Sequence, residues 1–189
     1  VKPVTHADLM RDYARETPNW ALQAKGQDIG NLLAVAALLA SGVRYRAGSF
    51  RAGLVWLGTL LYLVYAYVVY AMAVHLNFLF LVYVAVLGLS AWAVLFHIDG
   101  LRADAVAFPR GGRRRLAAWT LIATGVLFGL LWLSELVPAL ASGQVPASLQ
   151  EAGLVVNPIH AMDLSVVLPA FIVAGVAALR GRGHGLSPR

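Results

Sequence analysis

The sequence predicts an all-α protein, a polytopic transmembrane helix bundle of five spans. Of its 189 residues, 60% are hydrophobic and only 13% are charged, whereas soluble domains average about 45–50% apolar and about 25% charged residues. The mean hydropathy is +0.72, and several apolar stretches reach the length of about 20 residues that a helix needs to cross a bilayer. These observations exclude a disordered or fibrous chain and argue against a soluble globular enzyme.

Five segments are expected to cross the membrane as helices: residues 18–43, 52–74, 78–96, 116–140 and 158–179. The first is the least obvious, because only its second half, 31–43, is continuously apolar. Thr17-Pro18, however, combines an N-cap residue with proline at the first helical position, and this pattern extends the helix to a full span. Asn157-Pro158 marks the start of the last helix in the same way.

Arginine is concentrated in the connections after the first and third spans and in the C-terminal tail. These segments contain Arg44, Arg46, Arg51, Arg102, Arg110, Arg113, Arg114, Arg115, Arg180, Arg182 and Arg189. By the positive-inside rule they are cytoplasmic, so the N-terminal segment 1–17 is external and the tail 180–189 is cytoplasmic. The same rule accounts for the net charge of +6 without nucleic-acid binding. We expect one multi-pass domain over residues 1–189 in the cell membrane, in contact with the lipid bilayer.

Three carboxylates fall inside predicted spans. Glu135 lies at the interface, whereas Asp28 and Asp163 lie deeper, where a charged residue costs about 2.5–3.5 kcal/mol on insertion scales. At about 1.5 Å of rise per residue, both lie in the predicted outer leaflet, together with several tyrosines. The predicted ion- or ligand-binding residues are Asp28, Asn31, Tyr67, Tyr70, Tyr83 and Asp163. A buried tyrosine hydroxyl needs a partner, and either carboxylate is a candidate.

Each of these residues also has a structural interpretation. Asp28 is three residues from Lys25 and can form an in-helix ion pair, and His160 can lie in the headgroup region. Some tyrosines belong to an interfacial aromatic belt. The membrane tryptophans, Trp132 among them, are most simply packing or lipid-facing residues.

Three classes of function remain open. The first is transport or sensing of an ion, proton or small solute through the polar site. The second is an intramembrane metal site or metalloenzyme, in which His75, His160 and Glu135 have the side chains that zinc prefers, or in which His75 and His160 are the axial ligands of a b-type haem. The third is an accessory subunit or lipid binder. Whether the protein is an enzyme stays open, and the absence of cysteine excludes thiol chemistry.

Two further features concern packing and the chain's start. Gly125 and Gly129 form a Gly-x-x-x-Gly motif, which favours close packing of helices, either inside the bundle or in a homo-oligomer. The chain begins with Val1 rather than Met, so we expect upstream residues, among which a further helix is one interpretation.

Three segments together resemble a group of bacterial multi-helix integral membrane proteins with no assigned activity. They are Gly26-Gln27-Asp28, residues 77–84 (NFLFLVYV) and residues 157–164 (NPIHAMDL). The resemblance covers most of the chain from about Gln23 onward. It implies that the polar motifs belong together and carries no activity, cofactor or residue role with it.

Overall fold

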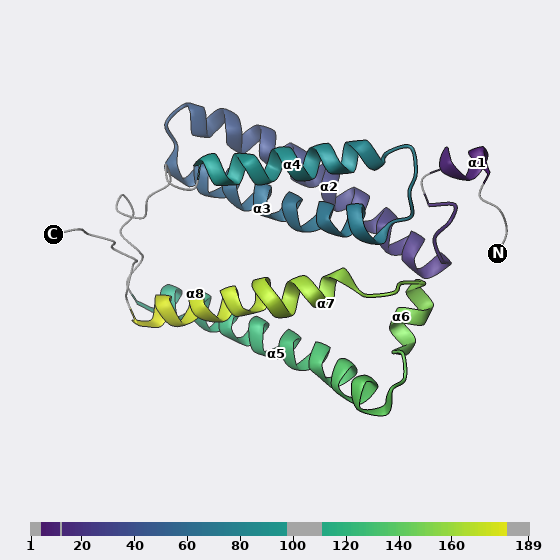
Figure 1. The fold of residues 1–189 in the computed structure, drawn as a ribbon. Helices are drawn as coiled ribbons and strands as arrows, with labels where there is room; N and C mark the ends of the chain where they lie inside the picture. Colours follow the sequence, from purple (N-terminus) through teal and green to yellow (C-terminus); the bar gives the residue numbers. More distant parts are fainter. Residues whose placement is uncertain (1–4, 12, 98–110, 181–189) are drawn as a thin grey trace. The chain divides into compact units, whose positions relative to one another are not determined.

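The computed structural model describes residues 5–11, 13–97 and 111–180, and every regular element in these ranges is a helix (Figure 1). Five helical segments are long and apolar enough to cross a membrane. They are α2 (Pro18–Arg46), α3 (Phe50–Ala73), α4 (Phe80–His97), α5 (Gly112–Ser142) and the segment Pro158–Arg180. The predicted all-α bundle of five spans is therefore confirmed, and the chain is a multi-pass membrane protein.

Two short helices flank the spans. Helix α1 (His6–Leu9) precedes α2, and α6 (Ala147–Ala152) lies in the connection between the fourth and fifth spans. The connection 98–110 and the tail 181–189, which carry several of the arginines used to orient the chain, lie outside the described residues. The orientation with the N-terminus outside stays a prediction.

The chain divides into two compact units. Unit 1 comprises Val1–Leu101 and Ser148–Val156, and unit 2 comprises Arg102–Ala147 and Asn157–Arg189. Unit 1 contains α2, α3 and α4, and unit 2 contains α5 and the last span. The single domain expected from the sequence remains a prediction.

In unit 1, α3 is the central helix and packs against both α2 and α4. Its buried residues recur every three or four positions and include Leu60, Leu63, Ala66 and Tyr70, so one face of the helix forms the core. The predicted N-cap of α2 is present, because the Thr17 hydroxyl accepts a hydrogen bond from the Trp20 backbone N–H at 3.3 Å. This cap begins the first span at the position the sequence indicated.

Large apolar side chains cover the outside of the helices. Leu32 of α2 is 71% exposed, Leu81 of α4 is 76% exposed and Leu140 of α5 is 82% exposed. In water such a surface would drive aggregation, whereas lipid tails are as apolar as leucine. The exterior is therefore suited to lipid.

In unit 2, small residues let two helices pack closely. A Cβ atom at Gly175 of α8 (Leu168–Arg180) would lie 2.6 Å from Ile122 Cγ1 and 2.7 Å from the Ala118 carbonyl oxygen. A Cβ atom at Gly125 of α5 would lie 2.9 Å from the Leu168 carbonyl oxygen. Each helix thus presents a glycine to the backbone of the other. Gly125 is used within the chain, and a homo-oligomer through Gly125 and Gly129 stays an untested expectation.

The last span is helical from Pro158 to Arg180, as the sequence predicts, and it contains a π-helical turn that the sequence analysis did not predict. Helix α7 (Pro158–Met162) leads into a π-helical turn, Asp163–Val167, and α8 follows. The Leu168 N–H bonds to the Asp163 carbonyl, five residues earlier. Pro169 is the second residue after this turn, and a proline inside a helix lacks an N–H and clashes with the carbonyl four residues before it. The wider π turn accommodates the ring.

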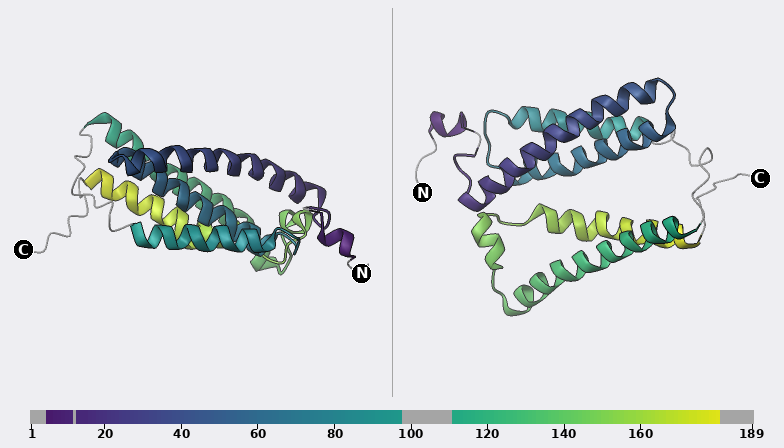
Figure 2. Two further views of the ribbon diagram at one scale, coloured as in Figure 1. Left: turned by 90° about the horizontal axis from the view of Figure 1, so that it is seen from above. Right: turned by 180° about the vertical axis from the view of Figure 1, so that it is seen from behind.

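The last span runs alongside α5 (Figures 1 and 2), and the close contacts of α5 and α8 lie between Gly125 and Leu168 and between Ala118 and Gly175. The two spans separate toward the C-terminal end of α5. The glycine contacts lie on the close part, and the wider part holds larger side chains from α5 and α7.

We expect Gly175→Ala to lower the thermal unfolding midpoint of the detergent-solubilised protein, because the new methyl group meets the backbone of α5. Overpacking of this kind typically costs about 1–3 kcal/mol. Gly129→Ala is the matched control, since a Cβ atom there would lie 4.0 Å from Leu168 Cδ1, an ordinary contact. Equal midpoints for the two variants would show that the glycine contact does not limit the packing of α5 and α8.

Candidate functional site

Asp28 of α2 accepts hydrogen bonds from two tyrosine hydroxyls. The Tyr70 hydroxyl of α3 lies 2.7 Å from Asp28 Oδ1, and the Tyr13 hydroxyl lies 3.0 Å from Oδ1 and 2.9 Å from Oδ2. Both hydroxyls donate, because an ionised carboxylate only accepts. The partners of Asp28 are therefore tyrosines from two other parts of the chain, rather than the Lys25 of the structural interpretation.

Three tyrosine rings pack beside this carboxylate. The ring centroids of Tyr70 and Tyr83 are 5.0 Å apart, and those of Tyr67 and Tyr70 are 5.4 Å apart. Tyr70 is 3% exposed and Tyr83 of α4 is 5% exposed, so these two rings belong to the core of unit 1, whereas Tyr67 is half-buried. Tyr13, Asp28, Tyr67, Tyr70 and Tyr83 form what we call the Asp28 cluster, in which every hydroxyl bonded to the carboxylate is neutral.

Asn31, also predicted to line the site, belongs to a second network one turn further along α2. Its Oδ1 accepts from the Tyr62 hydroxyl at 3.2 Å and from Gln27 Nε2 at 3.3 Å, and Gln27 Nε2 also donates to the Tyr62 hydroxyl. Gly30 makes this arrangement possible, because a Cβ atom there would lie 2.9 Å from the Tyr62 hydroxyl oxygen.

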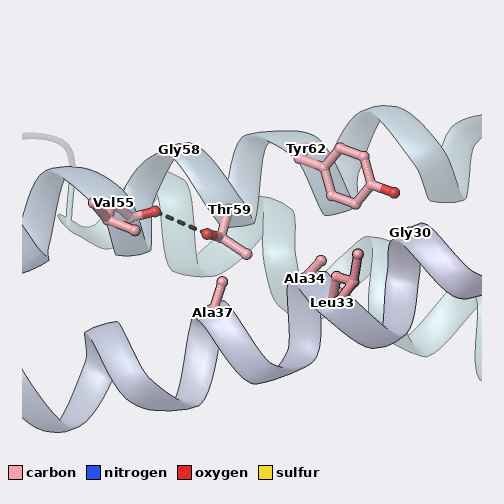
Figure 3. Close-up of a pocket in the computed structure, with 8 residues that line it drawn as sticks. All are labelled: Gly30, Leu33, Ala34, Ala37, Val55, Gly58, Thr59 and Tyr62. Carbon is pink, nitrogen blue, oxygen red and sulfur yellow. Dashed lines mark hydrogen bonds between the residues drawn. The ribbon is translucent and has the colours of Figure 1, made fainter.

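Next to this network an open groove of about 470 Å³ runs between α2 and α3 (Figure 3). Its lining residues are Gly30, Leu33, Ala34, Ala37, Val55, Gly58, Thr59 and Tyr62. The Thr59 hydroxyl donates to the Val55 carbonyl at 2.9 Å, so it is satisfied within its own helix. The groove is apolar apart from its end at Tyr62.

Residues just before α2 and in its first turn are hydrogen-bonded to the last residue of α3 and to the connection that follows it. Glu16 Oε1 accepts from the His75 backbone N–H at 2.7 Å and lies 3.0 Å from His75 Nδ1. The Trp20 indole N–H donates to the Ala73 carbonyl at 2.9 Å. The Glu16 side chain is only 1% exposed. We call the segment Tyr13–Thr17 the strap.

A second polar cluster lies in unit 2, around Asp163 at the start of the π turn. The Trp132 indole N–H of α5 donates to Asp163 Oδ2 at 2.9 Å. The rings of Trp132 and His160 are 4.5 Å apart, and His160 Nε2 lies 4.0 Å from Glu135 Oε2. Asp163 and His160 are both buried, so this arrangement again sets a carboxylate against an aromatic donor from a neighbouring helix.

The residues proposed for metal or haem are divided between the two units. His75 belongs to unit 1, where it contacts Glu16, and His160 and Glu135 belong to unit 2. Within the described residues, no group of three or more His, Asp or Glu side chains is arranged to hold a metal ion. Asp28 and Asp163 are likewise in different units, so a site that joins them stays a prediction.

Sequence reasoning missed Tyr13, Glu16 and the role of Trp132. Tyr13 and Glu16 precede the first span in a stretch with no apolar period, where no pattern links them to residues at the end of α3. Trp132 and Glu135 are three residues apart on α5 and therefore share a face. This spacing, together with the three-residue spacing of His160 and Asp163 on the last span, is the pattern that could have indicated a role for Trp132.

Comparison with protein-family models, with curated proteins and with solved structures finds no match for this chain. The candidate sites are therefore interpreted from their geometry alone.

We expect Tyr70→Phe to destabilise unit 1, because the variant keeps the ring and removes the hydroxyl that bonds to Asp28. A hydrogen bond to a charged group contributes about 1.5–3 kcal/mol. Tyr67→Phe is the control, since the Tyr67 ring packs in the same cluster but its hydroxyl makes no hydrogen bond within the described part of the chain. The free energy of unfolding measures both, and an equal loss would assign the effect to ring packing.

The Tyr13 hydroxyl makes the stability of the Asp28 cluster depend on pH at alkaline values. Burial, and then the nearby carboxylate, raises the pKa of Tyr13 above its ordinary value of 10.0. The folded protein therefore retains this proton where the unfolded chain loses it, and the contribution of Tyr13 to stability is complete below pH about 10 and declines as the pH rises further. We expect the wild type to lose stability above pH 10 more steeply than Tyr13→Phe. Parallel stability curves for the two proteins would contradict this.

Proposed function

We propose that this membrane protein binds a proton or a small monovalent cation at Asp28 and uses it in transport or sensing. The observation that carries the proposal is a partly buried carboxylate, inside a span, whose hydrogen-bond partners are the neutral hydroxyls of Tyr13 and Tyr70. A carboxylate within a membrane is costly and typically marks an ion or proton pathway.

Hydrogen bonding stabilises the carboxylate, which has no basic side chain bonded to it in the part of the chain that the structure describes. Two hydroxyls donate to the carboxylate, and charge-assisted hydrogen bonds are about twice as strong as neutral ones. They leave the net charge uncompensated, however, because neither donor is a cation. A bound proton or cation removes that charge, which favours occupancy of the site.

The aromatic rings support a cation as the ligand. Tyr67, Tyr70 and Tyr83 pack within 6.1 Å of one another, and the faces of tyrosine rings attract cations within about 6 Å of the ring centroid. A carboxylate beside such rings suits a monovalent ion or an ammonium group.

Asp163 is a second buried carboxylate within a span, in unit 2, and it accepts a hydrogen bond from the neutral indole of Trp132. We include it in the proposal as a separate carboxylate. No observation within the described residues favours the metal site, the haem or the accessory-subunit alternatives, and none of these is proposed.

The test is the stability of the purified protein under different cations at constant ionic strength. Wild type in sodium, potassium or ammonium chloride is compared with wild type in N-methylglucamine chloride, and each is titrated with pH. A ligand at 100 times its Kd stabilises the folded state by about 2.7 kcal/mol. We expect such a shift for at least one cation or for the proton, and its loss in Asp28→Asn, which preserves the shape of the side chain.

Asp163→Asn is the matched variant, because it changes a buried carboxylate of unit 2 and leaves the Asp28 cluster intact. A cation or pH response that is identical in wild type and Asp28→Asn would refute the proposal for Asp28. For whichever ion stabilises the protein, flux into proteoliposomes then distinguishes transport from sensing.

A further inference from the structure

We infer that the strap Tyr13–Thr17 is a gate over Asp28: a ligand reaches the carboxylate when the Tyr13 hydroxyl leaves it, and the contact of Glu16 with His75 keeps the gate closed. The inference rests on the proposed function, to which it adds the route of access and the residues that control it.

The two tyrosines on Asp28 are held differently. The Tyr70 hydroxyl also lies 3.0 Å from the Ala24 carbonyl, and Tyr70 is a core residue of α3 at 3% exposure. Tyr13, in contrast, comes from an irregular segment before α2, and its single O–H proton is shared between both carboxylate oxygens. Tyr13 can therefore leave without disturbing the bundle, and its hydroxyl occupies the position that a ligand would take.

Glu16 anchors the strap to the α3–α4 connection. Glu16 Oε1 accepts from the backbone N–H of His75 and contacts its ring nitrogen, while the side chain of His75 is 44% exposed. Releasing this contact frees the segment that carries Tyr13. The first turn of α2 is secured separately, by the Thr17 cap and by the bond from the Trp20 indole to the Ala73 carbonyl. The movement is therefore confined to residues 13–16 of the strap.

The closed state also leaves a buried polar atom without a hydrogen bond among the described residues. Glu16 Oε2 is buried and has no hydrogen-bond partner among the described residues. A buried polar atom without a partner costs free energy, and opening the strap returns this oxygen to water. A gate requires two states of similar free energy, and the buried oxygen brings the closed state nearer to the open one.

The chain contains no cysteine, so one introduced thiol reports access directly. In Asp28→Cys, the rate of modification by a charged, membrane-impermeant thiol reagent measures how often the strap is open. We expect this rate to rise at least tenfold when Glu16→Ala is added. Adding Glu16→Gln, which keeps an oxygen acceptor for the His75 N–H, should leave the rate close to that of the parent. Lys25→Cys is the control, because Lys25 is exposed and its modification should not depend on Glu16.

In a second experiment, the gate is locked closed by a cross-link in a protein that keeps Asp28. In Glu16→Cys/His75→Cys, a short thiol cross-linker replaces the anchor with a covalent bond. We expect the cation or pH response to disappear on cross-linking and to persist in the same variant without the cross-linker. Equal modification rates in Asp28→Cys with and without Glu16→Ala, or an undiminished response after cross-linking, would overturn the gate.

The two proposals fail separately. A cation response that needs Asp28 but ignores the strap variants would leave the proposed function standing and reject the gate. Modification rates that follow Glu16, with no cation or pH response at all, would instead establish a mobile strap over a carboxylate that binds no such ligand.

Discussion

Lipid offers no hydrogen bonds, so every polar group within a span must find its partner inside the protein. The rest of the structure depends on this constraint. The hydroxyl groups of Thr59 and Thr120 bond to carbonyls four residues earlier in their own helices. A carboxylate has no such local solution, because helix carbonyls are acceptors too. Asp28 therefore requires donors from elsewhere, and Tyr70 and Tyr13 connect α2 to α3 and to the strap.

The two units provide a donor for their carboxylate in the same way. In each, a carboxylate on one helix accepts from an aromatic donor on a neighbouring helix, Tyr70 in unit 1 and Trp132 in unit 2. The two carboxylates differ in their further surroundings. Asp28 is covered by Tyr13 from a segment outside the spans, whereas Asp163 begins a π turn whose widened backbone accommodates Pro169. Access is therefore expected to depend on the strap in unit 1.

Much of the architecture was predictable from the sequence because a bilayer imposes length and polarity on a helix. The starts of the first and last spans followed from Thr17-Pro18 and Asn157-Pro158, and Gly125 pointed to close packing. The π turn was not predicted, although Pro169 was its signal, because a proline in a helix produces a kink, a break or a widened turn according to its surroundings. The role of Trp132 was missed because an indole in a span usually faces lipid or packs.

By itself, the sequence determined a five-span membrane protein and identified Asp28 and Asp163 as the residues hardest to reconcile with lipid, since both conclusions depend on transfer free energies that each residue carries with it. Only the tertiary structure decided which donors these carboxylates have. Tyr13 and Tyr70 are 15 and 42 residues from Asp28, and no periodicity extends across such a separation. The partners are set by which helix ends pack together, and that depends on the contacts of the whole unit.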